Sequence, residues 1–189
     1  MRKIPWAALG ATALVGVAAC KAAPARYLDP NMDFGAVRTV AVFPFANLTR
    51  DALADERVRD VFSSMLLASS SVYVVPPGEV QRAFAQAGTA NPSTPSVEDV
   101  VKLGKALQAD AVVTGSVKEY GEVRSGTASA NVVSVSVQMM ETGTGRVVWS
   151  ASSTKGGVTM ADRLLGSSGI PINQVTEAVV DELLAKLFK

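Results

Sequence analysis

ASANVVSVSVQMM, residues 128–140, is the stretch that decides the fold, because apolar and polar side chains alternate along most of it. This period of two predicts a strand with one buried face. The turn ETGTG, residues 141–145, follows, and its glycines can adopt positive φ values. RVVWSAS, residues 146–152, is then predicted to return as the partner strand of an antiparallel hairpin.

Three apolar runs before the hairpin predict further strands. Residues 38–45 are almost continuously apolar and should be buried on both faces, and Pro44 limits this strand because proline cannot donate to a ladder. Residues 72–75 form a short strand that Pro76 stops. Residues 111–117 read AVVTGSV and are a candidate central strand.

Four segments have apolar residues at helical spacing: 54–69, 79–86, 97–107 and 173–189. We expect Asp51 to cap the first, Gly88 to stop the second, and Ser96 with Asp99 to form a capping box on the third. The fold class is therefore α/β. The sequence predicts a single-domain sandwich with a mixed β-sheet packed by helices, including the late antiparallel hairpin and a C-terminal helix.

The sequence LVGVAAC, residues 14–20, reads as a lipobox. Arg2 and Lys3 precede an uncharged run too short to span about 30 Å of hydrocarbon comfortably, so we expect a cleaved signal peptide. The cut is predicted between Ala19 and Cys20, and Cys20, the only cysteine, is predicted to carry diacylglycerol and palmitate. The alternatives are an ordinary secretory signal with an accidental cysteine and a retained membrane anchor.

These features divide the chain into a lipoprotein signal peptide (1–19), the lipidated Cys20 with a tether (20–36), and a periplasmic domain (37–189). The segment 21–33 contains two prolines and no apolar period, and could hold the domain up to about 40 Å from the membrane. Lys21, rather than Asp, follows the cysteine, which resembles the outer-membrane sorting pattern of enterobacterial lipoproteins.

The composition excludes several functions. The chain has 18 basic and 17 acidic residues and no histidine. A nearly neutral chain lacks the basic field for nucleic acid, so we expect no nucleic-acid partner. The usual zinc, copper and haem ligands are missing, and we expect no metal and no cofactor. Asp55, Glu56 and Asp60 lie on the wet face of a helix, so we expect a solvated surface there and no enzyme.

Trp149 has two interpretations, a buried core residue or an aromatic interface anchor. The segments 124–126 and 155–157 are either a polar rim at one end of the sheet, presented to a neighbour, or simply solvated turns.

Four segments carry a family resemblance: VAVFPFANLT (40–49), VVP (74–76), ADAVVTGSVKEY (109–120) and TGTGRVVW (142–149). They resemble the curli-secretion (CsgG-like) lipoprotein superfamily, which is similar in fold to the amino-terminal domain of TolB and to the PelC and LpoB lipoproteins. The resemblance implies a domain that faces the periplasm from the outer membrane and forms a ring or binds a partner.

We therefore expect a non-catalytic assembly or accessory component of an envelope or export (secretion) complex, acting through self-association as a homo-oligomer or through docking on envelope proteins. The alternative is an LpoB-like activator of a peptidoglycan synthase. A CsgG-type secretion pore is less favoured, because each spanning strand needs about 9 to 11 residues. Only eleven residues separate Tyr120 from Val132, and the 155–169 loop contains four glycines, Asp162 and Arg163.

Overall fold

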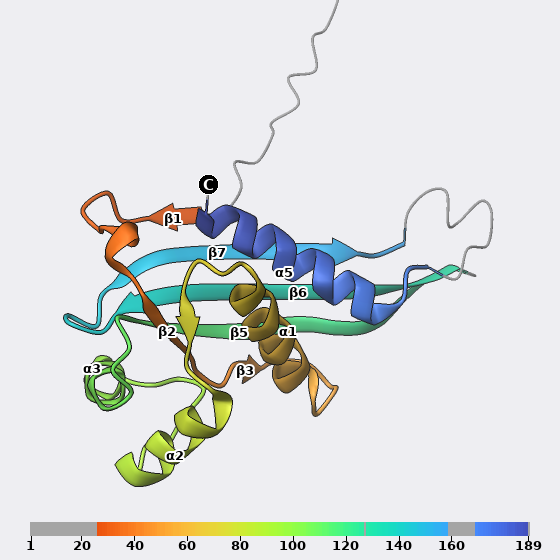
Figure 1. The fold of residues 1–189 in the computed structure, drawn as a ribbon. Helices are drawn as coiled ribbons and strands as arrows, with labels where there is room; N and C mark the ends of the chain where they lie inside the picture. Colours follow the sequence, from red (N-terminus) through yellow and green to blue (C-terminus); the bar gives the residue numbers. More distant parts are fainter. Residues whose placement is uncertain (1–25, 127, 159–168, 189) are drawn as a thin grey trace, which may run out of the picture.

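The computed structural model describes residues 26–126, 128–158 and 169–188. These residues form one seven-stranded mixed sheet and four α-helices (Figure 1). The strands are β1 (Arg26–Leu28), β2 (Thr39–Val42), β3 (Ala46–Asn47), β4 (Tyr73–Val74), β5 (Ala111–Ser125), β6 (Ala128–Glu141) and β7 (Val147–Gly156). The helices are α1 (Ala54–Ala68), α2 (Pro77–Ala87), α3 (Val97–Ala106) and α5 (Ile172–Phe188), with a short 3-10 helix η1 (Phe34–Ala36). The predicted fold class is confirmed.

The sheet has the order β1-β7-β6-β5-β2-β4, with β3 also beside β5. β2 pairs in parallel with β4 and with β5, and β3 pairs in parallel with β5. The pairs β5–β6, β6–β7 and β7–β1 are antiparallel. The predicted late hairpin is therefore present, and it is part of a longer antiparallel meander. β5 lies between β2 and β6, as expected of a central strand.

Helices cover the two faces of the sheet unequally. On one face, α1 and α5 pack against apolar residues from β2, β5, β6 and β7, and this is the larger core. On the other face, α2 and α3 pack against a smaller cluster around Phe43, Phe84 and Val112. In Figure 1, α2 and α3 lie toward the β2 end of the sheet, away from β7 and β1.

Local signals fix the ends of most helices. Ser96 and Asp99 form the predicted capping box of α3, and Gly88 ends α2 with a φ of 65°. Asp51 does not cap α1 as predicted. The N-cap of α1 is Leu53, and the Asp51 carboxylate instead accepts a hydrogen bond from the Leu53 amide and pairs with Arg57.

The tether is shorter than the predicted segment 20–36. Residues 26–28, within the segment expected to lie outside the domain, form the edge strand β1, with Tyr27 opposite Ser150 and Leu28 opposite Trp149 on β7. The Asp29 amide then donates to the Val148 carbonyl. The sheet therefore begins at Arg26, eleven residues before the predicted domain start at Val37.

The β5–β6 hairpin is longer than the apolar pattern indicated. The ladder runs from Ala111 opposite Glu141 to Ser125 opposite Ala128, with one bulge between Val117 and Glu119. Residues 121–125 and 128–131 thus continue the two strands, and we call residues 119–126 and 128–134 of this hairpin the arm. Figure 1 shows the arm projecting beyond the helices.

Candidate functional site

Small polar side chains fill the part of the second sheet face that α2 and α3 leave uncovered. The register places Thr114, Gln138 and Ser150 in one row across β5, β6 and β7, and Ser116, Ser136 and Ser152 in the next. Residues directly opposite each other in an antiparallel pair project to the same face. A third row consists of Glu119, Ser134 and Thr154. We call these nine residues the open polar face.

The rows form because the strands alternate. Val133, Val135, Val137 and Met139 point into the larger core, so their neighbours on β6 must point to the opposite side. Two hydrogen bonds join side chains within the open polar face: Gln138 Nε2 donates to Thr114 Oγ1 (3.1 Å), and the hydroxyls of Ser134 and Thr154 lie 2.8 Å apart.

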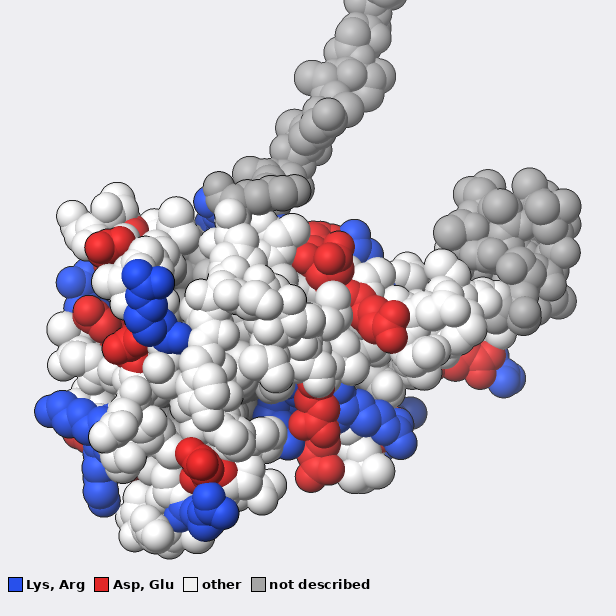
Figure 2. Space-filling view, in the orientation of Figure 1, with Lys and Arg blue, Asp and Glu red and all other residues white. Residues whose placement is uncertain are grey.

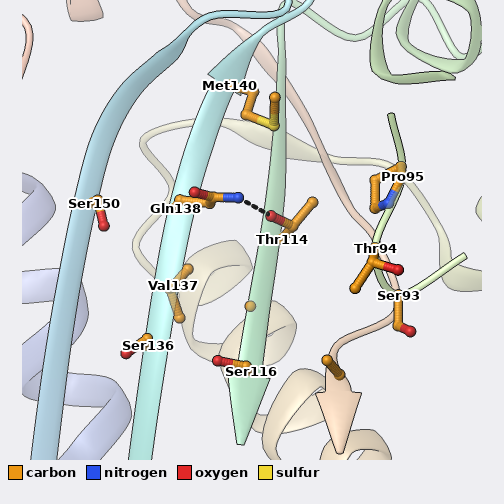
Figure 3. Close-up of a pocket in the computed structure, with 12 residues that line it drawn as sticks. Ser93, Thr94, Pro95, Thr114, Ser116, Ser136, Val137, Gln138, Met140 and Ser150 are labelled. Atoms are coloured by element: carbon orange, nitrogen blue, oxygen red, sulfur yellow. Dashed lines mark hydrogen bonds between the residues drawn. The ribbon is translucent and has the colours of Figure 1, made fainter. Parts of the chain in front are cut away.

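The first two rows, apart from Ser152, form one wall of a hollow of about 360 Å³. Figure 3 shows Ser93, Thr94 and Pro95, from the loop between α2 and α3, facing Thr114 and Ser116 across this hollow. Met140 lines one end of it. None of the described residues that line it has an ionisable side chain. The hollow can donate and accept hydrogen bonds, and its lining residues hold no ionisable group that could act as a general acid or base or activate one of the hydroxyls.

An ion cluster lies on the other side of the sheet, between α5 and β7. The Glu182 carboxylate on α5 pairs with Lys155 at the end of β7 and with Lys186 (2.6 Å), and Lys186 Nζ also donates to the Ser152 carbonyl (2.7 Å). Hydrogen bonds from Lys155 and Lys186 lower the pKa of Glu182 to about 2. This ion cluster fixes α5 to β7.

The arm carries a second, exposed ion pair. Glu122 lies 3.5 Å from the Arg124 guanidinium on the same strand. A hydrogen bond from Ser129, on the facing strand, and then the interactions with Arg124 lower the pKa of Glu122. Lys155 lies in the row of Val133, nearer the body than Arg124, which is opposite Ser129. The two predicted rim segments thus lie at the same end of the sheet, but Lys155 is paired with Glu182.

The structure decides the interpretation of Trp149. Its side chain is fully buried, and its indole Nε1 donates to the Lys186 carbonyl at the end of α5 (3.3 Å). A side chain in this position cannot serve as an exposed anchor, so Trp149 is a core residue. Ala19 and Cys20 lie outside the described residues.

The remaining candidate residues form no chemical site. Asp55 accepts from the Asn47 amide and Asp60 pairs with Arg59, so both belong to the solvated surface of α1. Among the described residues, no group of three or more potential ligands is placed to hold a metal ion. Within the same residues, no helix combines the length and apolar character needed to cross a bilayer.

The alternation of residues 128–140 predicted only the β6 part of the open polar face, because a period of two puts Ser134, Ser136 and Gln138 on one side of that strand. The β5 and β7 parts were missed. The available signal was the same small polar side chain at alternate positions, Thr114 and Ser116 on β5 and Ser150 and Ser152 on β7.

Comparisons with known proteins identify a family and a fold. A family model for GNA1162-like lipoproteins matches residues 33–188. Comparison with the curated proteins finds no match. The fold is similar to that of the PelC dodecamer from Paraburkholderia phytofirmans, with a TM-score of 0.57 and 17% identity over 87% of this chain and 98% of that chain.

Two further solved structures are similar to this chain. Lipoprotein GNA1162 from Neisseria meningitidis matches with a TM-score of 0.53 and 24% identity, over 78% of this chain and 99% of that chain. The LpoB C-terminal domain from Salmonella enterica matches with a TM-score of 0.49 and 16% identity, over 67% of this chain and 87% of that chain.

Proposed function

Because this chain belongs to the GNA1162-like lipoprotein family, we propose that it is a lipid-anchored, non-catalytic accessory component of an envelope or export complex. The observation that carries the proposal is the open polar face. Eight of its nine side chains are hydroxyl or amide groups, and the ninth, Glu119, is an exposed carboxylate. Together with the uncharged hollow, such a face suits hydrogen bonding to another macromolecule. The wider CsgG-like superfamily stays a prediction from the sequence.

The proposed anchor is diacylglycerol on Cys20, with the signal peptide cleaved after Ala19. Two or three acyl chains hold a protein to a bilayer almost irreversibly, at about 0.8 kcal/mol per buried methylene. Lys21 supports sorting to the outer membrane, with the domain facing the periplasm.

We propose that the protein self-associates. PelC, which shares the fold, is described as a dodecamer. The open polar face supports self-association here, because hydroxyl groups can act as both donor and acceptor and so can pair with an identical or a different surface. Docking on another envelope protein through the same face is the second form of the proposal.

The length of the tether argues against an LpoB-like activator that must reach across the periplasm. Only five residues, 21–25, separate Cys20 from β1, so the link spans at most roughly 20 Å. The pore is disfavoured because the residues between Tyr120 and Val132 continue the β5–β6 hairpin without an added pair of spanning strands.

The test is the mass of the detergent-extracted full-length lipoprotein across a concentration series. We expect a defined oligomer that Ser136→Arg, in the centre of the open polar face, converts to smaller species. Ser64→Arg, an exposed serine on α1, is the matched control and should leave the mass unchanged. A monomer at every concentration would exclude self-association.

If the protein is monomeric, crosslinking in cells from a photoreactive residue at position 136 tests docking instead. A specific crosslinked envelope protein, absent when the photoreactive residue is at position 64, supports the accessory role. Absence of any crosslink from position 136 would contradict the assignment of the open polar face.

A further inference from the structure

We infer that the end of the sheet formed by β1, together with the end of α5, lies against the phospholipid surface in the anchored protein. We call Arg26, Tyr27, Leu28 and Phe188 the membrane-facing edge. The inference rests on the proposed lipidation of Cys20 and adds to it the orientation of the domain and a second contact with the bilayer.

The chain between the proposed lipid and the sheet is short. Six Cα–Cα steps connect Cys20 to Arg26, so Arg26 lies within roughly 20 Å of the lipidated sulfur even when the link is fully extended. β1 lies at the edge of the sheet, and among the described strands it pairs with β7 alone. The anchor therefore pulls one specific edge of the sheet toward the bilayer, while α2 and α3 lie toward the opposite end (Figure 1).

Large side chains on this edge are exposed to solvent. Tyr27 is 47% exposed and Leu28 is 39% exposed, and they project to opposite faces of the sheet. Phe188, at the end of α5, is 48% exposed. Tyrosine and apolar side chains of this kind are favourable where headgroups meet acyl chains.

Leu28 and the end of α5 lie close together although they are far apart in sequence. Leu28 is directly opposite Trp149, and the Trp149 indole donates to the carbonyl of Lys186. Phe188 follows Lys186 by two residues, so the exposed side chains of β1 and α5 belong to one end of the molecule.

The membrane-facing edge and its immediate surroundings carry basic side chains. Arg26 on β1 is exposed, and the exposed Arg146 guanidinium is held beside β1 by Asp29, whose own carboxylate is buried. Figure 2 shows basic side chains at the point where the described chain begins and acidic side chains along the outer face of α5. Glu177 and Asp181 are the exposed acidic residues on that helix. Lipid phosphates favour the basic edge over the acidic helix face.

The test uses single-cysteine labelling, because the proposed lipid occupies the sulfur of Cys20 and leaves any introduced cysteine as the one free thiol. Full-length lipoproteins carrying Tyr27→Cys or Leu28→Cys are labelled with a fluorophore and reconstituted into vesicles of phosphatidylethanolamine and phosphatidylglycerol that contain a headgroup-nitroxide lipid. Gln81→Cys, exposed on α2, is the matched control. We expect strong quenching at positions 27 and 28 and little at position 81.

Flotation of the same vesicles separates the two proposals. If the protein does not float with them, the lipid anchor is wrong. If it floats but the three positions are quenched equally, the anchor holds and the orientation is wrong. If position 28 is quenched without nitroxide lipid and dilution with unlabelled protein relieves this, a second copy covers the edge and the inference is overturned.

Discussion

Asp29 and Arg146 form an ion pair although they are 117 positions apart in the chain, with Asp29 Oδ2 3.1 Å from Arg146 Nη2. The Asp29 side chain is only 5% exposed, and its other oxygen accepts from the backbone amide of Asn31 at 2.9 Å. The pair connects the turn after β1 to the start of β7. It therefore fixes the point at which the proposed anchor enters the domain.

We expect Asp29→Ala to release β1 from the sheet edge. The substitution leaves the Asn31 amide and the Arg146 guanidinium without their acceptor, which should lower the free energy of unfolding by about 1–3 kcal/mol. Chemical denaturation measures this loss, and hydrogen exchange should show faster exchange for the amides of β1. Asp181→Ala, which removes an exposed carboxylate on α5, is the control and should change little. Unchanged exchange in β1 would contradict the role of the pair.

Strand β1 could not be predicted from the sequence, whereas several other elements could. Local patterns predicted β6, the helix α5 and the capping box at Ser96, because these depend on neighbours a few residues apart. β1 is only three residues long and lies between Pro24 and Pro30, so it has no period of its own. Its pairing with β7 is a non-local contact that no local signal specifies.

The open polar face was predictable only strand by strand. The alternation of β6 showed that Ser136 and Gln138 share a side, but not that α2 and α3 would leave that side uncovered. That outcome depends on the order of the strands. Trp149 illustrates the same limit, since its burial follows from the packing of α5 over β7.

We expect Gly104→Ala to destabilise the protein, although alanine is the better helix former. A Cβ at position 104 of α3 would lie 2.3 Å from Thr142 Cγ2, so the helix or the turn after β6 must move. Such overpacking typically costs about 1–3 kcal/mol. Denaturant unfolding measures the loss, and Thr142→Ser should relieve part of it in the double variant, since it removes Cγ2.

Gly78→Ala is the matched control for this prediction. A Cβ at position 78, in the first turn of α2, has no neighbour within 4 Å. Alanine should therefore stabilise the protein slightly, by up to about 1 kcal/mol. Equal effects of Gly104→Ala and Gly78→Ala would show that the contact with Thr142 is unimportant.

Ser153→Ala should stabilise the protein. The Ser153 side chain is buried and lies opposite Val135, on the side of the larger core. Its hydroxyl oxygen has no hydrogen-bond partner among the described residues. Removing an unsatisfied buried hydroxyl should raise the free energy of unfolding by roughly 1 kcal/mol. Ser152→Ala, on the open polar face, is the control, and a greater gain there than at Ser153 would contradict the reasoning.

Acid should weaken the attachment of α5 to β7 through Glu182. Because Lys155 and Lys186 lower the pKa of Glu182 from 4.5 to about 2, the folded state holds this carboxylate ionised where the unfolded chain binds a proton. The stabilisation is present above pH 4.5 and is lost as the pH falls toward 2. Solvent screening keeps the size of this stabilisation modest, because a third of the Glu182 side chain is exposed.

Glu182→Gln should therefore lower stability at pH 7 and flatten the dependence of stability on pH between 4.5 and 2. Denaturant unfolding at each pH measures this slope, with Glu177→Gln, an exposed carboxylate on the same helix, as the control. An unchanged slope in Glu182→Gln would show that the ion cluster does not stabilise the contact between α5 and β7.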